Sequence, residues 1–388
     1  MSARHIVVAA TLAGWGGVAV CATPAAAAPA PAAAPTPAAA APTPAAAPTP
    51  AAALAPAAGP GAVAPTARVA PAAKGRPGDK ARRILGDSRS PHPWHSGAWV
   101  GGYMSAKRAN QWGTWRGSAS DTTPTFPERG SWRDIAASTW HIDTYRGFGG
   151  VLSYGLPLLP EGADPSRLQD VAAGRHDATF RTIARDLRTR GRANTLVKIG
   201  WEPNGTWWSW SADKDSARHY RQAFRRVAAV MNKETPQLTF AFEINCGSAM
   251  PGQTGRLDSL TRLYPGNEAV DVIGCSAYDW SGSGATTEAQ WKAALHPRNG
   301  AGVGDVAAFA RAKSKGLSFT EWGLAPTSKG GNGDNPFFIR KMKQFFDSQA
   351  DILVMESYFN EPDATMRNGL WAQDPQNPRA AAVYRQLW

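Results

Sequence analysis

The chain lacks the residue groupings on which metal- and cofactor-dependent enzymes rely. Its seven histidines are scattered, without a His-x-x-x-His pair, and three cysteines cannot form a metal-binding quartet. No phosphate-binding loop and no Gly-x-Ser-x-Gly turn occur, and no Gly-x-Gly-x-x-Gly follows the first predicted strand. We therefore expect neither a metal nor a cofactor.

Concentrated charge is also lacking in the part of the chain that can fold. Lys and Arg number 42 against 30 Asp and Glu, a formal net charge of +12. Residues 1–90 hold eight basic and two acidic residues, which accounts for half of that charge. The other basic residues are dispersed, so no nucleic-acid partner is expected.

The first 28 residues have the pattern of a secretory signal peptide. Arg4 and His5 precede an apolar stretch at 6–20 that ends in small residues. This stretch is short and Gly-rich for a membrane span, and Val20 stands where lipoprotein processing usually takes a small residue. We expect a secreted protein, extracellular or associated with the cell envelope, without a membrane span in the mature chain. A retained N-terminal anchor is the alternative.

Residues 29–89 consist largely of Ala and Pro and have no apolar periodicity. Such a segment cannot bury enough surface to fold, so it is predicted to be a disordered, extended tether. The remaining part, 90–388, has ordinary globular composition and suits a single α/β barrel acting as a monomer.

Short β-rich runs alternate with helical patterns beyond residue 90, which predicts a parallel sheet with crossover helices. Eight strands are expected, at 98–103, 142–148, 150–155, 195–201, 238–244, 270–277, 317–320 and 352–358. Helices are expected at 177–190, 217–232, 304–315 and 336–349. The predicted fold is a (β/α)8 TIM barrel. Only Gly149 separates the second and third strands, so the barrel is irregular there or one strand is misassigned.

Two cysteines, Cys246 and Cys275, remain after removal of the signal peptide and lie near the ends of neighbouring predicted strands. An oxidising compartment permits a disulfide between them, and two free buried thiols are the alternative.

Two carboxylates stand at strand ends, where the loops of a barrel mouth converge. Glu202 follows the strand at 195–201, and Glu321 follows the strand at 317–320. Glycoside hydrolysis needs such a pair, one as acid and the other as nucleophile or base. Glu243 and Glu356 also lie in predicted strands, where each could line the site or form a buried ion pair with an arginine.

Residues from about 97 to 370 resemble glycoside hydrolase family 26, best known for β-mannanases. The matching segments are Trp201-Glu202-Pro203-Asn204-Gly205, Thr320-Glu321-Trp322-Gly323 and Tyr278-Asp279-Trp280. The resemblance implies that Glu202 is the acid/base, that Glu321 is the nucleophile, and that Tyr278 hydrogen-bonds the nucleophile. Trp201 stands where the family usually has His, and Lys198 stands where it usually has Arg. These two differences leave the identity of the substrate sugar open.

Tryptophan is abundant, and 15 of 16 follow residue 90, many in predicted loops. Apolar sugar faces stack on such rings. The expected substrate-binding residues are Trp112, Trp201, Asn204, Trp207, Trp208, Trp210, Tyr278 and Trp280, with Trp115 a further cleft candidate. The Gly-rich segment 329–334 is expected at the rim of the cleft.

The sequence thus predicts a secreted, retaining endo-β-glycanase whose partner is a polysaccharide or oligosaccharide, with β-mannan the leading substrate. Two alternatives remain open. One is a hydrolase of another glycan, such as mixed-linkage β-glucan, xylan or an arabinose-containing envelope polymer. The other is a non-catalytic carbohydrate-binding barrel of the cell envelope.

Overall fold

The structure is a computed structural model that describes residues 75–101, 104–137, 139–280, 283–372 and 375–388. The predicted signal peptide, and the predicted tether as far as residue 74, lie outside the described residues.

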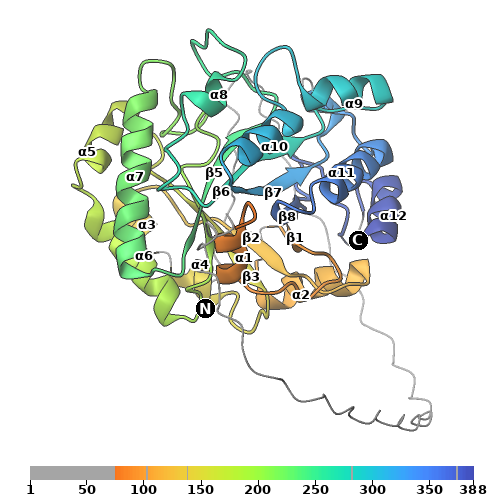
Figure 1. Cartoon of the computed structure of the whole chain (residues 1–388). Coiled ribbons are helices and arrows are strands. Elements are labelled where there is room, and N and C mark those ends of the chain that lie inside the picture. Colours follow the sequence, from red (N-terminus) through yellow and green to blue (C-terminus); the bar gives the residue numbers. More distant parts are fainter. Residues whose placement is uncertain (1–74, 102–103, 138, 281–282, 373–374) are drawn as a thin grey trace, which may run out of the picture. The chain divides into compact units, whose positions relative to one another are not determined.

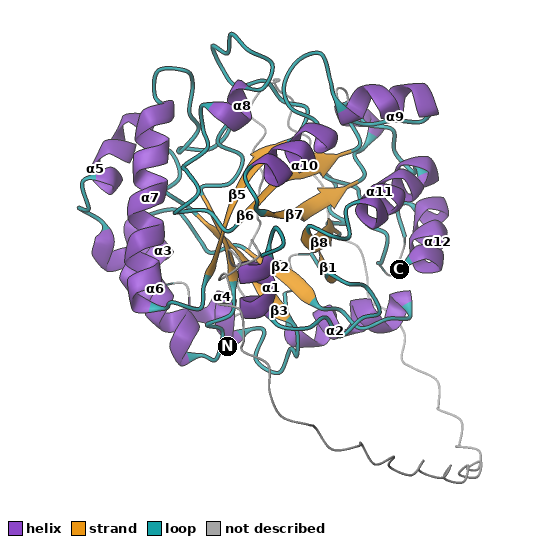
Figure 2. Ribbon diagram, in the orientation of Figure 1, coloured by secondary structure: helices purple, strands orange, loops and turns teal. Residues whose placement is uncertain are grey.

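Eight parallel strands form a closed barrel in which β1 pairs with both β2 and β8. Figure 2 shows the strands surrounded by helices. The strands are β1 (His95–Trp99), β2 (Thr122–Thr125), β3 (Val151–Leu156), β4 (Leu196–Ile199), β5 (Thr239–Asn245), β6 (Val272–Tyr278), β7 (Gly316–Gly323) and β8 (Leu353–Phe359). The predicted (β/α)8 barrel is therefore confirmed, and its C-terminal strand ends converge at one mouth.

Helices cover the outside of the barrel (Figure 1). They are α2 (Ala106–Arg116), α3 (Trp132–Ala136), α4 (Thr139–Asp143), α5 (Leu168–Ala172), α6 (Asp177–Thr189), α7 (Ala217–Glu234), α8 (Asp258–Thr261), α9 (Glu288–Leu295), α10 (Val303–Ala312), α11 (Pro336–Ser348) and α12 (Pro378–Leu387). Short 3-10 turns lie at Pro165–Arg167 and Thr327–Lys329. The expected stripe of α6, from Phe180 to Leu187, is buried as helical periodicity predicts.

The predicted second strand at 142–148 is wrong. That segment holds the end of α4 and a turn, and its buried side chains Ile142, Tyr145 and Phe148 recur every third residue, which is not a strand period. The true β2 reads Thr-Thr-Pro-Thr and carries little apolar signal. With β2 placed there, α3 and α4 occupy the crossover to β3, so the missing helix is restored.

The folded part begins before residue 90, contrary to the predicted boundary. Helix α1 (Asp79–Leu85) packs against the strands rather than in the outer ring (Figure 1). Its Ala81 and Leu85 are buried with the first residues of three strands, Val151, Leu196 and Val272. The helix thus covers the N-terminal end of the barrel. Four of its seven residues are charged, so it carried no recognisable apolar pattern.

Candidate active site

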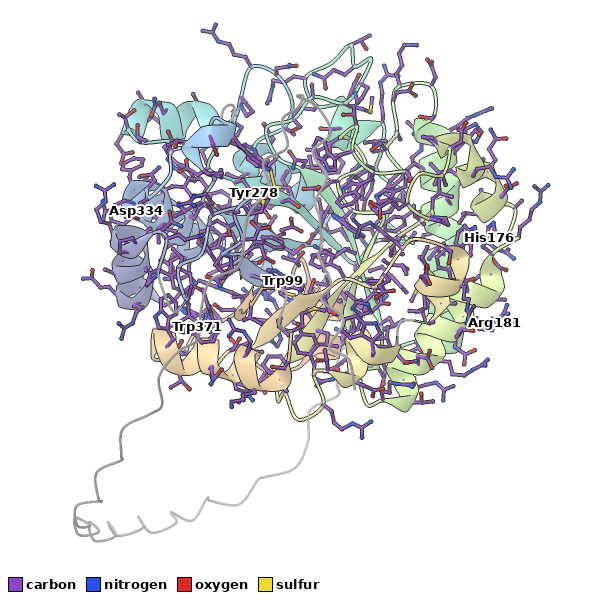
Figure 3. All side chains as sticks on the ribbon, turned by 180° about the vertical axis from the view of Figure 1, so that it is seen from behind. Trp99, His176, Arg181, Tyr278, Asp334 and Trp371 are labelled. Carbon is purple, nitrogen blue, oxygen red and sulfur yellow. A yellow bond between two sulfur atoms is a disulfide. The ribbon has the colours of Figure 1, made fainter. Side chains whose placement is uncertain are left out.

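A cavity of about 290 Å³ opens at the mouth of the barrel. Residues at the ends of β4 to β8 and in the loops that follow form its lining. They are Glu202, Trp207, Trp208, Asn245, Ser248, Tyr278, Trp280, Glu321, Lys329, Phe359 and Met366. Tyr278 lies near the middle of the molecule seen from behind, whereas Arg181 of α6 lies at its edge (Figure 3).

Glu202 reaches this cavity through an unusual backbone conformation. Its φ angle is 53°, in the left-handed region that residues with a side chain seldom adopt. The backbone N–H of Glu202 donates to the carbonyl of Glu243 at 2.8 Å, which holds the turn. Such strained positions persist only where the surrounding structure holds them in place, and they concentrate at functional sites.

Three N–H groups hold the carboxylate of Glu202. The indole Nε1 atoms of Trp207 and Trp208 donate to its Oε2 at 2.9 Å and 3.1 Å. The Nδ2 of Asn245 donates to its Oε1 at 2.8 Å. Both oxygens are therefore oriented before any ligand enters the cavity.

Glu321 lines the same cavity from the end of β7. The hydroxyl of Tyr278 donates to its Oε1 at 2.7 Å, and Nζ of Lys198 lies 3.4 Å from its Oε2. Burial raises the pKa of Glu321 to about 7, and the charge of Glu202 acts in the same direction. Lys198 and the Tyr278 hydrogen bond oppose that rise.

The structure brings together most of the residues that the motifs selected. Glu202, Glu321, Tyr278, Trp207, Trp208 and Trp280 all line the cavity. The rings of Tyr278 and Trp280 lie 4.9 Å apart and form part of an aromatic wall. Lys329 also lines the cavity, as expected for the rim segment.

Several tryptophans do not reach the cavity, contrary to expectation. Trp112 is fully buried on α2, where its ring stacks on Tyr358. Trp210 is fully buried, and its Nε1 donates to the carbonyl of Trp201 at 2.8 Å. Trp201 is itself buried and packs against Trp208. Trp201 and Trp210 pack against the cavity residue Trp208, and none of these three buried rings offers a face to a sugar. Trp115, which also lies on α2, packs on Tyr384.

Asn204 has a supporting position rather than the expected substrate contact. It is buried, and its Oδ1 accepts from the backbone N–H of Asn245 at 2.7 Å. Its Nδ2 donates to the carbonyls of Asn245 and Ser248 at 2.9 Å and 3.1 Å. Asn204 therefore fixes the loop whose Asn245 holds Glu202.

Sequence reasoning missed Ser248, Phe359 and Met366 as cavity residues. Phe359 ends β8, where the rule that barrel sites lie at strand ends would have selected it. Met366 lies in an irregular loop after β8, and no sequence signal marks it.

Cys246 and Cys275 form a disulfide, with their Cα atoms 5.5 Å apart. The bond connects the residue that follows β5 with the middle of β6. Cys246 directly follows Asn245, which holds Glu202, and Cys275 precedes Tyr278 by three residues. The disulfide therefore adjoins Asn245, one of the residues that contact the Glu202 carboxylate.

Within the ranges that the structure describes, no three His, Cys, Asp or Glu side chains are grouped so as to hold a metal ion. Among those same residues, no helix has the length and hydropathy needed to cross a membrane.

Comparison with known proteins relates the chain to mannanases. No family model matches it. A mannan endo-1,4-beta-mannosidase from Bifidobacterium adolescentis is 32% identical over 123 residues, which is 30% of this chain and 11% of that protein. The chain thus spans about a tenth of the length of the curated relative that it matches.

Solved structures share the fold. The catalytic domain of a GH26 endo-beta-1,4-mannanase from Bacillus sp. JAMB-750 has a TM-score of 0.52 and 16% identity, covering 74% of this chain and 80% of that one. A structure of fungal beta-1,4-galactanases has a TM-score of 0.52 and 11% identity, with coverage of 76% and 99%. The similarity to family 26 mannanases expected from the motifs is confirmed, while the structural likeness at these identities shows the barrel fold alone.

Proposed function

We propose that the protein is a secreted glycoside hydrolase that cleaves an internal β-linkage of a polysaccharide, with β-1,4-mannan the leading substrate. The observation that carries the proposal is the meeting of Glu202 and Glu321 in one aromatic-lined cavity at the mouth of the barrel. Glycosidases need two carboxylates on one sugar ring, and the rings of Trp207, Trp208 and Trp280 supply stacking surfaces.

The proposed reaction is a double displacement. An oxygen of Glu321 attacks the anomeric carbon while the glycosidic bond breaks and Glu202 gives its proton to the leaving oxygen. Glu202 then takes a proton from water, whose oxygen attacks the same carbon. The bond to Glu321 breaks and its electrons return to the carboxylate. Each step leaves the anomeric carbon with one new bond and one broken bond.

The surroundings of the two carboxylates support this division of roles. Tyr278 and Lys198 contact one oxygen each of Glu321, which fixes the carboxylate for attack. Glu202 is contacted by N–H groups of Trp207 and Trp208, in the loop after β4, and of Asn245, at the end of β5. The acid/base must exchange its proton with ligand and water, whereas the nucleophile must be held at one place.

Secretion is supported by two features that are independent of the cavity. The predicted signal peptide begins the chain, and the Cys246–Cys275 disulfide is typical of an oxidising compartment.

The test is hydrolysis by the purified protein of β-1,4-mannan, β-1,4-galactan, mixed-linkage β-glucan, xylan and arabinan. We expect mannan to be cleaved fastest into oligosaccharides. The inclusion of galactan follows from the barrel shared with the fungal galactanases. Proton NMR of the first product reports the anomer: retention supports double displacement, and inversion contradicts it. An intact, folded protein that cleaves none of these glycans would favour the binding-protein alternative.

A further inference from the structure

A lysine without solvent exposure lies beneath the proposed nucleophile. Nζ of Lys198 is 3.4 Å from Oε2 of Glu321 and 4.0 Å from Oε2 of Glu243. The side chains of Lys198 and Glu243 are both 0% exposed. On its other sides the ammonium faces aromatic rings, 4.6 Å from the centroid of Phe126 and 5.8 Å from that of Trp201. Its charge is therefore compensated by two carboxylates and little else.

Glu243, on β5, is held in place by two hydroxyl groups of β7. Ser318 Oγ donates to its Oε1 and Thr320 Oγ1 donates to its Oε2, each at 2.6 Å. Both hydroxyls come from β7, the strand that carries Glu321. Glu243 does not line the cavity, so it cannot touch a sugar there. Its role in the reaction must act through another group.

The proposed reaction changes the charge balance around Lys198. In the free protein with Glu321 ionised, one buried ammonium faces two carboxylates. When Glu321 becomes a glycosyl ester, its negative charge disappears and Lys198 loses its closer partner. An unpaired buried charge is strongly destabilising in a medium of low polarity. Glu243 is then the one carboxylate within 4.0 Å of the ammonium among the described residues.

We propose, on the basis of the function proposed above, that Glu243 is a positioning residue that keeps Lys198 charged beneath Glu321 throughout the catalytic cycle. The ammonium is shared by two carboxylates while Glu321 is ionised, and it pairs with Glu243 alone while Glu321 is esterified. No bond forms or breaks at Lys198 or Glu243, and neither gains or loses a proton. The retained charge then attracts the carboxylate of Glu321 as the ester is hydrolysed.

The arrangement predicts opposite effects of two substitutions on the ionisation of Glu321. The titratable or charged groups facing Glu321 are Lys198 and Glu202 on or after β4 and Tyr278 on β6, and Glu243 on β5 acts through Lys198. Lys329, after β7, lines the same cavity. From β8, the cavity residue Phe359 carries no charge. In Glu243→Gln, Glu321 is the remaining carboxylate that the Lys198 ammonium attracts, so the ionised form of Glu321 is favoured. Lys198→Met removes that pull and favours the protonated form.

The experiment is the pH dependence of kcat/KM on the glycan that the wild-type protein cleaves fastest. We expect the acid limb to move to lower pH in Glu243→Gln and to higher pH in Lys198→Met, each by about one pH unit, the size expected for one nearby charge. We expect kcat to fall at least tenfold in Glu243→Gln, because the ester intermediate leaves Lys198 unpaired. Lys198→Arg should restore much of the wild-type profile.

Glu356→Gln is the matched control. Glu356 is an equally buried glutamate on β8, hydrogen-bonded to Ser96, Trp322 and Trp388 and without a contact to Lys198. A purely structural effect of losing a buried carboxylate would appear in both Gln variants. The inference requires the acid limb to move in Glu243→Gln and to stay in place in Glu356→Gln.

A second readout does not depend on activity. The side-chain carboxyl carbons of carbon-13-labelled glutamate are titrated by NMR, and the Glu321 signal is assigned by its loss in Glu321→Gln. If Glu243→Gln folds poorly, Thr320→Val, which removes one donor to Glu243, should lower the Glu321 midpoint in the same direction by less. A wild-type protein that cleaves no glycan would contradict the proposed function, while this titration still decides the inference. An unchanged or raised Glu321 midpoint in Glu243→Gln would overturn it.

Discussion

Two regions of the molecule hold a glutamate that receives two indole N–H groups, and they serve different purposes. At the mouth, Glu202 accepts from Trp207 and Trp208 beside the cavity. In the barrel wall, Glu356 accepts from Trp322 at 2.7 Å and from Trp388 at 3.0 Å.

The difference between the two lies in access and backbone geometry. Glu202 follows the end of β4 with a φ of 53°, whereas Glu356 lies within β8 and is 0% exposed. Burial raises the pKa of Glu356 although Ser96, Trp322 and Trp388 oppose the rise, so a perturbed carboxyl group alone does not identify a reactive one. What distinguishes the mouth is a second carboxylate on the same open cavity.

The largest expected effect distinguishes Glu321 from Glu356. Glu321→Ala should reduce kcat by roughly 10⁴-fold or more, because Glu202, the other carboxylate among the described residues of the cavity lining, is needed as acid/base. Circular dichroism and the melting temperature should show an intact fold. Glu356→Ala should instead reduce stability while the remaining folded protein keeps its turnover within a few-fold. Equal losses of kcat in both variants would remove the distinction between the two regions.

The next effect separates the two indole-bound glutamates. Glu202→Gln should lower kcat on a glycan by about 10²- to 10⁴-fold, since the leaving oxygen receives no proton. The loss should be much smaller on an aryl glycoside whose phenolate leaves without protonation. Glu356→Gln should show no such dependence on the leaving group. Equal losses of Glu202→Gln activity on both substrates would argue against an acid/base role.

A third comparison concerns the aromatic residues of the two regions. Trp207→Ala should raise KM about tenfold or more and leave stability nearly unchanged, because Trp207 is only partly buried beside the cavity. Trp112→Ala should cost about 3–5 kcal/mol of unfolding free energy with KM unchanged, as expected for a large buried ring. Urea unfolding and steady-state kinetics measure the two effects. A raised KM in Trp112→Ala would instead indicate that Trp112 takes part in substrate binding.

The smallest effect is on the pH dependence of stability. The pKa of Glu321 is raised by burial to about 7, so the folded state holds a proton that the unfolded chain has released. Its contribution to stability is fully present below the unfolded pKa and is lost as pH rises through about 7. Glu321→Gln should therefore be more stable than wild type at pH 8, with the gain shrinking towards pH 5. Urea unfolding at both values checks this, and a gain independent of pH would contradict it.

Much of the fold was predictable because long helices carry strong periodicity. Helices α6 and α7 lie where the apolar spacing placed them, and some of the buried strands, such as β6, are nearly continuous apolar runs. β2 was missed because a Thr-rich strand with a proline gives almost no apolar signal. The spacing of Ile142, Tyr145 and Phe148 marked an apolar segment but was assigned the wrong period.

The candidate site was predictable where chemistry coincides with a strand end, as at Glu202 and Glu321. It was unpredictable where packing decides. The sequence gives no reason why Trp207 lines the cavity while Trp210, three residues later, is fully buried. Met366 enters the lining from a loop whose path depends on the whole barrel. Side-chain direction in irregular loops follows from tertiary contacts, which local patterns do not contain.

The most direct test of the central claim is mass spectrometry of the protein after reaction with a 2-deoxy-2-fluoro mannosyl fluoride, which slows hydrolysis of a glycosyl ester. We expect one sugar to be attached per protein, on the peptide that contains Glu321, and turnover on glycan to be lost in proportion. Attachment at another carboxylate, or rapid turnover of the reagent with inversion at the anomeric carbon, would contradict the account.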